Sequence, residues 1–136
     1  MSKRRKARET ALQALYASEV SGQDWEEALD DMIRRRKPSE EAIEYSRRIA
    51  SIVDRSKEEL DGMIEGCLEN WRLERISLID RTILRIALTE LMHCPEVPTV
   101  VIINEAIEVA HRFSSDKAGK FVNGILDRLA REVRGD

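Results

Sequence analysis

Glycine, proline, aromatic residues and cysteine are all scarce in this sequence of 136 residues. Six glycines and three prolines, with two residues each of Trp, Tyr and Phe, are too few for the tight turns of an all-β barrel or sandwich. No apolar run is longer than four residues, whereas a membrane-spanning helix needs about 18. The basic start lacks the apolar segment of a signal peptide, and two cysteines, Cys67 and Cys94, make no disulfide framework. Composition therefore predicts a helical, cytoplasmic protein without a membrane segment, with both cysteines in the core.

Sequence motifs for catalysis, cofactor binding and metal binding are also missing. There is no GxGxxG, and Gly119 and Gly124, which have the spacing of a phosphate-binding loop, are not followed by Lys and Ser or Thr. The two histidines, His93 and His111, do not combine with the cysteines at any common zinc-ligand spacing. We therefore expect no enzymatic activity, no cofactor and no metal.

Apolar residues recur every three or four positions along the whole chain, which is typical of amphipathic helices. The pattern predicts helices over residues 4–20, closed by Gly22, and from a capping box at 24–27 to near 37–38. Further helices are predicted after Ser39 to Trp71, from Ser77 to a stop at Pro95, over 100–113, and from a cap at Ser114 or Ser115 to Val133. The third helix extends to Trp71, with candidate kinks at Ser56 or at Gly62 and Gly66. The β-branched run 100–103 resembles a strand, but helical spacing continues beyond it. The prediction is an all-α fold: a compact bundle of about six or seven helices, with residues 1–136 forming one domain.

Polar and small residues inside the last two predicted helices need separate explanations. Gly119 and Gly124 are costly in a helix interior, so we expect close approach by another helix or a ligand. Asn104 and Asn123 lie within apolar segments, and we interpret them as internal hydrogen-bonding residues rather than as base readers.

The first predicted helix begins with five cations and no acid: Lys3, Arg4, Arg5, Lys6 and Arg8. The rest of the chain holds 18 Lys and Arg against 26 Asp and Glu, so a basic arm adjoins an acidic body. Cations at a helix start repel one another and oppose the helix dipole, so the helix itself gives no reason for them. An external polyanion gives one, because Arg and Lys bind phosphate. A basic tail that only aids solubility remains the alternative.

A second basic run occupies residues 34–37. It falls at the predicted end of a helix, where cations stabilise the helix dipole. We interpret this run as structural.

Aromatic residues accompany two groups of cations. Tyr16 follows the basic arm, and Phe121 follows Lys117 and Lys120 at the start of the last predicted helix. A base can stack on an aromatic ring beside cations that bind phosphate, which favours single-stranded RNA as the ligand. Each ring also has the spacing of a core residue, and this alternative stays open.

Five segments, in this order and at this spacing, resemble the NusB family of bacterial transcription antitermination factors. The segments are RRKARE (4–9), ALQALY (11–16), ILRIAL (83–88), INEAIE (103–108) and FVNGILD (121–127). The resemblance runs nearly end to end. It implies an all-α fold of two small helical subdomains and a non-enzymatic role in antitermination, especially on ribosomal RNA operons.

The resemblance also implies partners and binding residues. Proteins of this family pair with NusE, a small-subunit ribosomal protein, and together hold single-stranded boxA RNA for the transcribing RNA polymerase complex. The implied RNA-binding residues are Lys3, Arg4, Arg5, Lys6, Arg8, Tyr16, Lys117, Lys120 and Phe121. The implied NusE-binding residues are Tyr16, Glu19, Asp80, Arg81 and Arg85, although Asp80 with Ser77 also matches a helix-capping box.

Two functions without boxA specificity remain open beside this one. A helical regulator would bind duplex DNA through the same basic arm. A scaffold would dock an acidic protein there and bind no nucleic acid at moderate salt.

Overall fold

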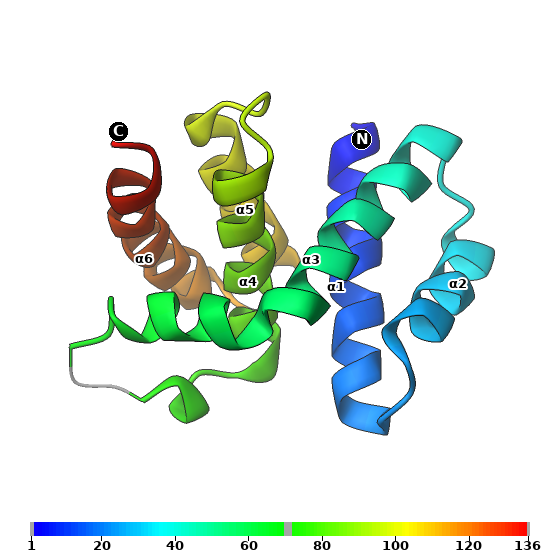
Figure 1. The fold of residues 1–136 in the computed structure, drawn as a ribbon, viewed down its shortest axis with the longest axis horizontal. Coiled ribbons are helices and arrows are strands. Elements are labelled where there is room, and N and C mark those ends of the chain that lie inside the picture. Colours follow the sequence, from blue (N-terminus) through cyan, green and yellow to red (C-terminus); the bar gives the residue numbers. More distant parts are fainter. Residues whose placement is uncertain (1, 70–71, 136) are drawn as a thin grey trace. The chain divides into compact units, whose positions relative to one another are not determined.

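A computed structural model of the chain describes residues 2–69 and 72–135. The elements in these ranges are α1 (Lys3–Ser21), α2 (Trp25–Arg36), α3 (Glu40–Glu65), the 3₁₀-helix η1 (Leu73–Arg75), α4 (Leu78–His93), α5 (Thr99–Phe113) and α6 (Asp116–Arg134). The described ranges contain no strand, so the all-α prediction is confirmed (Figure 1). None of the described helices combines the length and the apolar character needed to cross a membrane.

The chain forms two compact units, residues 1–55 (unit 1) and 56–136 (unit 2). In unit 1, α1 packs against α2 (Figure 1). The apolar positions predicted for α1 are buried: Ala7, Ala11, Leu12 and Leu15. The helix ends as predicted at Gly22, whose φ of 80° is the left-handed conformation that glycine adopts without strain. Asp24 caps α2 by accepting a hydrogen bond from the backbone N–H of Glu26 at 3.1 Å.

The third helix is long and bent, as its sequence predicts. Its backbone leaves helical geometry at Ser56, one of the predicted kink positions, and unit 2 begins at this residue. The helix ends at Glu65, earlier than the apolar periodicity predicts, and a turn follows at Gly66 and Cys67. Trp71, the predicted last member of the apolar stripe, lies outside the described residues.

In unit 2, α4 packs against both α5 and α6. Its residues 82–91 are all buried, which confirms the central position that its nearly uniform apolar sequence predicts. The β-branched run at 100–103 is helical. It lies in the first turns of α5, which begins at Thr99 directly after Pro98. Cys67 and Cys94 are buried free thiols, as predicted. Burial raises the pKa of the Cys67 thiol, and the neighbouring Glu132 carboxylate adds to this effect.

One arginine holds the end of α4 to the end of α6. The Arg134 guanidinium donates hydrogen bonds to the carbonyl oxygens of Leu91 (2.9 Å), Cys94 (2.9 Å) and Val97 (2.7 Å). It also donates to the Glu90 carbonyl at 3.2 Å. The Glu90 and Cys94 carbonyls also accept backbone hydrogen bonds, from Cys94 and Val97, so Arg134 adds a second donor there. It also places a cation at the negative end of the α4 dipole.

The structure confirms one of the predictions made for the glycines and asparagines of α5 and α6 and contradicts others. A β-carbon at Gly119 would stand 2.6 Å from Cδ2 of His111 in α5, so close approach by another helix is confirmed there. At Gly124 nothing lies within 4 Å, so close approach by another helix is wrong there. The internal role expected for Asn104 and Asn123 is also wrong, because both side chains lie on the exposed faces of their helices.

Candidate nucleic-acid interface

The basic arm of unit 1 is the first two turns of α1. Ser2 caps this helix, and its Oγ accepts a hydrogen bond from the backbone N–H of Arg5 at 3.0 Å. Lys3 and Arg4 are exposed and Lys6 is half-buried. Arg8 differs from the others because it is only 4% exposed. The five cations are therefore ordered on a helix, and four of them reach the surface.

Unit 1 itself supplies partners for part of the basic arm. Lys3 pairs with Glu41 of α3 at 3.2 Å. The guanidinium carbons of Arg4 and Arg8 lie 4.6 and 5.9 Å from the ring centre of Tyr45, also in α3. The expectation that nothing in the fold accounts for these cations is therefore corrected, because neighbouring side chains of α3 offset part of their repulsion.

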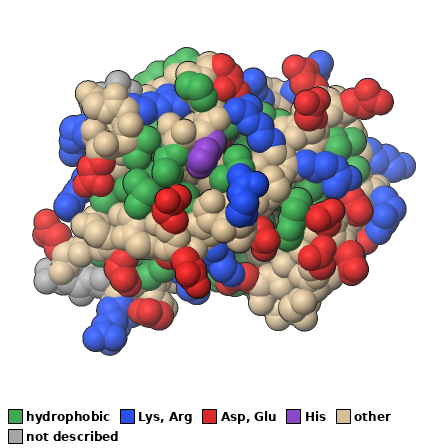
Figure 2. Space-filling model, in the orientation of Figure 1, with side chains coloured by type: hydrophobic (Ala, Val, Ile, Leu, Met, Phe, Trp, Pro, Cys, Tyr) green, Lys and Arg blue, Asp and Glu red, His purple; other side chains and the backbone are tan. Residues whose placement is uncertain are grey.

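Several exposed arginines of unit 1 pair with acidic side chains. On the face drawn in Figure 2, Lys and Arg side chains are interspersed with Asp and Glu side chains. Within unit 1, Arg34 pairs with Asp31 in α2, and Arg47 of α3 pairs with Asp30 of α2 at 2.7 Å. The run at residues 34–37 belongs to this pattern, and its Arg36 pairs with the buried Glu9 at 2.6 Å. Its interpretation as structural therefore gains a tertiary reason beside the helix dipole.

The second half of α1 carries two exposed candidates. Tyr16 is 37% exposed, so it is not a core residue, and Glu19 is exposed one turn further along. Val20, 64% exposed, extends the same end of the helix with an apolar side chain. An aromatic ring, a carboxylate and an apolar group on one helix end offer contacts to either a base or a protein.

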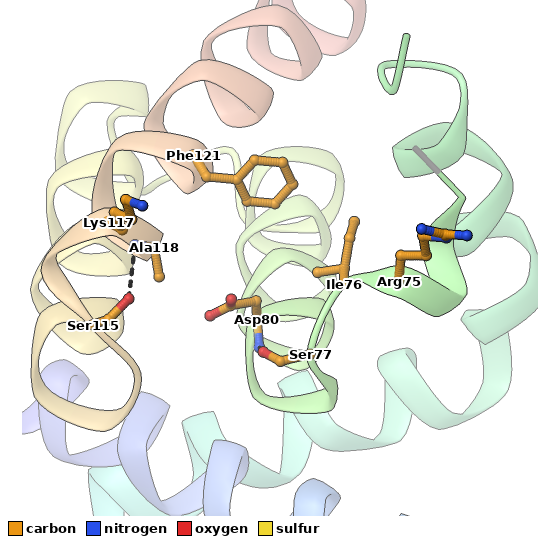
Figure 3. A pocket seen from close by; sticks show the side chains of 8 residues that line it. All are labelled: Arg75, Ile76, Ser77, Asp80, Ser115, Lys117, Ala118 and Phe121. Carbon is orange, nitrogen blue, oxygen red and sulfur yellow. Dashed lines mark hydrogen bonds between the residues drawn. The ribbon is translucent and has the colours of Figure 1, made fainter. Parts of the chain in front are cut away.

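Unit 2 contains a pocket of about 440 Å³ between the start of α4 and the start of α6. The residues lining it are Arg75, Ile76, Ser77, Asp80, Ser115, Lys117, Ala118 and Phe121. In Figure 3 the Phe121 ring projects from α6 toward Ile76, and the Asp80 carboxylate projects from α4 toward α6. The pocket therefore joins residues from both predicted sets: Lys117 and Phe121 for RNA, and Asp80 for the protein partner.

Two helix starts shape the electrostatics of this pocket. Ser77 caps α4 by accepting a hydrogen bond from the Asp80 N–H at 3.1 Å, so the capping role predicted for Ser77 is confirmed. Ser115 caps α6 by accepting one from the Ala118 N–H at 3.0 Å (Figure 3). Helix starts carry partial positive charge and Lys117 adds a full charge, so these groups attract an anion such as phosphate, whereas the Asp80 carboxylate in the same lining repels one.

The carboxylate of Asp80 has unused hydrogen-bonding capacity. Its Oδ1 is buried and has no hydrogen-bond partner among the described residues. The Nε–H of the neighbouring Arg81 is also buried and has no hydrogen-bond partner among the described residues. Buried polar atoms are normally paired, so a bound base or protein donor at Asp80 would supply a partner that the described part of the chain does not.

Arg85 and Lys120 complete the predicted set and lie in very different surroundings. Lys120 is exposed on α6, next to Phe121, although it does not line the pocket. Arg85 is 4% exposed and donates to both carboxylate oxygens of Asp61 at 2.7 and 2.9 Å. The expectation of a partner contact at Arg85 is therefore corrected to an ion pair inside unit 2.

Sequence reasoning missed Tyr45 and Asp61. Tyr45 was not distinguished from the apolar stripe of its helix, although Arg4 and Arg8 have the spacing of one helix face and Arg48 follows Tyr45 by three residues. Asp61 is one of many acidic residues, and no local pattern marks its partner 24 positions away. No group of three or more potential metal ligands occurs in the described part of the chain.

Comparisons with known proteins identify the family. The pattern that defines the NusB family matches residues 5–131. Transcription antitermination protein NusB of Bacillus velezensis is 42% identical over 96% of this chain and 98% of its own length. The protein of the same name from Clostridium botulinum is 37% identical over 93% of this chain and 98% of its own length.

Solved structures agree with the sequence relatives. NusB of T. maritima is 38% identical, with a TM-score of 0.89 over 95% of this chain and 91% of its own. A crystal structure of antitermination factors NusB and NusE in complex with dsRNA includes a chain that is 26% identical, with a TM-score of 0.89 over 97% of this chain and 98% of that one. Because the family pattern covers nearly the whole sequence, the fold is shared and full-length relatives exceed 30% identity, this chain belongs to the NusB family.

Proposed function

We propose that this protein is a transcription antitermination factor that binds boxA-type RNA together with NusE and supports transcription of ribosomal RNA operons. Its family consists of antitermination proteins rather than enzymes. The solved relative with NusE and RNA supports both kinds of partner. Contact with the transcribing RNA polymerase would be indirect, through this assembly.

The observation that carries the proposal is the pocket in unit 2. A half-buried ring at Phe121, a cation at Lys117 and a buried carboxylate oxygen without a partner at Asp80 face one space of about 440 Å³. An aromatic face stacks on a base, a cation binds the phosphate beside it, and an unpaired carboxylate accepts a hydrogen bond from a base or from a protein. These are the contacts of an RNA site that is shared with a protein partner.

One group of side chains would bind RNA and a second group would bind NusE. RNA contacts are proposed at Lys3, Arg4, Arg5, Lys6, Tyr16, Lys117, Lys120 and Phe121. NusE contacts are proposed at Tyr16, Glu19, Asp80 and Arg81. The buried residues Arg8 and Arg85 would support these surfaces from within their units. Phosphate contacts would supply most of the affinity and base contacts a modest preference, while NusE would enlarge the RNA surface.

Binding measurements on unit 2 variants test the RNA site. Phe121→Leu keeps an apolar side chain but removes the stacking face, and should weaken boxA RNA binding by about 1–3 kcal/mol. Lys117→Ala should reduce the salt slope of binding by about 1. Arg131→Ala removes an exposed cation from the other end of α6 and serves as the matched control. Equal affinities of all three variants and the wild type would contradict the RNA site.

Competition distinguishes the proposed ligand from the alternatives. Single-stranded boxA RNA, duplex RNA and duplex DNA of the same sequence would compete for the protein in one assay. Preference for duplex DNA would favour the helical regulator, and no binding at moderate salt would favour the scaffold.

Co-purification with the organism's own NusE, with and without boxA RNA, tests the partner. We expect a complex that RNA strengthens, and a weaker complex for Asp80→Asn. Failure to form the complex in either condition would contradict the NusE assignment.

A further inference from the structure

Tyr45 stands at the centre of a cluster of arginines in unit 1. The guanidinium carbons of Arg4, Arg8 and Arg48 lie 4.6, 5.9 and 6.0 Å from the centre of its ring. Two of these arginines come from α1 and one from α3, the helix that carries Tyr45. The ring itself is only 6% exposed, so packing fixes its position.

The kind of contact that a cation makes within the protein decides how much of its positive charge can still attract a phosphate. A carboxylate that pairs with a cation offsets part of its charge, as Glu41 does for Lys3 at 3.2 Å. A tyrosine ring is neutral and attracts a cation through its quadrupole, so the attraction leaves the positive charge in place. Tyr45 therefore stabilises neighbouring like charges without neutralising them.

Order in a long side chain has a direct effect on binding. An arginine that is fixed before the ligand arrives does not lose its rotamer freedom on binding, a cost of about 0.5–1.5 kcal/mol per side chain otherwise. Arg4 is exposed and its guanidinium lies closest to the ring centre, while Arg8 is buried and lies 5.9 Å from it. Among these arginines, Arg4 is therefore the side chain that would bind an RNA phosphate more tightly because the Tyr45 ring already fixes its position.

We propose that Tyr45 is a positioning residue for RNA binding, which holds Arg4 in a phosphate-ready position through a cation–π contact. The inference rests on the proposed function, because it needs RNA as the ligand of the basic arm. It assigns a binding role to a residue that touches no RNA itself. It also explains how the start of α1 tolerates the charges of Arg4 and Arg8, because the Tyr45 ring attracts both.

Substitutions at position 45 test the proposal, because they can change the electrostatics of the ring face while the ring keeps nearly the same shape. Tyr45→Phe keeps the electron-rich ring face and should bind boxA RNA like the wild type. Pentafluorophenylalanine at position 45 has nearly the same shape but a reversed quadrupole. It should bind RNA about fivefold more weakly, the effect expected for losing one exposed cation–π contact. In an Arg4→Ala background the difference between the two rings should disappear.

Several outcomes would overturn the proposal. Equal RNA affinity of the two ring variants would do so, as would tighter binding by the fluorinated ring, which would mean that Tyr45 withholds the arginine. A difference that persists in the Arg4→Ala background would assign the effect to another cation. Both rings fill the same space, so equal thermal unfolding temperatures would verify that the comparison concerns binding and not folding.

A readout without RNA separates this inference from the proposed function. In the free protein, the NMR signal of the Arg4 Nε–H should shift and broaden when the fluorinated ring replaces Phe. If this change occurs but the wild type binds no RNA, the proposed function fails and the positioning contact stands. If the wild type binds RNA but the Arg4 signal is the same with both rings, only the positioning role is overturned.

Discussion

Arg85 and Asp61 form a two-pronged ion pair: Nε and Nη2 of the arginine donate to the two carboxylate oxygens at 2.7 and 2.9 Å. The pair links α4 to the second part of α3 within unit 2. The Arg85 side chain is 5% exposed and that of Asp61 is 23% exposed. A guanidinium fork fits a carboxylate in this geometry, so the pair fixes the register of the two helices.

Arg85→Ala should lower the free energy of unfolding by about 3 kcal/mol, because it leaves Asp61 without this cation in a largely buried place. Urea denaturation measures the loss, and Arg85→Ala combined with Asp61→Ala should recover part of it. The folded variant should keep its affinity for NusE. Loss of NusE binding at unchanged stability would instead return Arg85 to the partner surface.

Arg134→Lys should lower stability by about 2 kcal/mol despite keeping the charge. Lysine cannot reproduce the fork that now donates to the carbonyls of Leu91 and Val97, and losing a hydrogen bond to a buried carbonyl is costly. Thermal unfolding measures the effect, with the exposed Arg131→Ala as control. An unchanged unfolding temperature for Arg134→Lys would show that the charge alone, and not the fork, stabilises the end of α4.

Arg36→Ala should be much more destabilising than Arg35→Ala, although the two arginines are neighbours. Arg36 donates to Glu9, whose side chain is 1% exposed, and also to Gln13, whereas Arg35 is exposed. Removing a partner of a buried carboxylate costs about 3 kcal/mol, and an exposed substitution changes stability by about 0.5 kcal/mol or less. Chemical denaturation of the two variants compares them directly. Equal losses would mean that the helix dipole alone explains the basic run.

Asp31 should titrate below its ordinary pKa of 3.8, because a hydrogen bond from Gln23 stabilises the carboxylate and the Arg34 charge adds to this, while desolvation acts in the opposite direction. A carboxyl with a lowered pKa in the folded state stabilises the fold above pH 3.8, and the contribution is lost as pH falls through the folded pKa. Gln23→Ala should raise the pKa of Asp31. An NMR titration of the side-chain carboxyl measures both values, and an Asp31 pKa that does not respond to Gln23→Ala would contradict the assigned cause.

The helices could be predicted because their signals are local. Apolar spacing, the cap at Asp24, the left-handed Gly22 and the stop at Pro95 each act within a few residues, and each appears where the sequence places it. The end of α3 was mispredicted because apolar periodicity continues past Glu65 while the chain turns at Gly66. Asn123 was mispredicted because its apolar neighbours in sequence lie on another face of α6.

The candidate site was predictable in residue type but not in arrangement. The sequence marks Phe121, Lys117 and Asp80 separately, and only the packing of α6 on α4 brings them to one pocket. It also treats the five cations of the basic arm as equivalent. The fold distinguishes them, since it buries Arg8, pairs Lys3 with Glu41 and leaves Arg4 exposed against Tyr45.

The sequence by itself determined the helices, the basic start of α1 and the family, because these depend on spacing and residue type along the chain. Only the tertiary structure decided which charged side chains are exposed and which are buried in ion pairs or against a ring. Partner choice among charges depends on distances between residues far apart in sequence, such as the 24 positions between Asp61 and Arg85, and no local pattern encodes them.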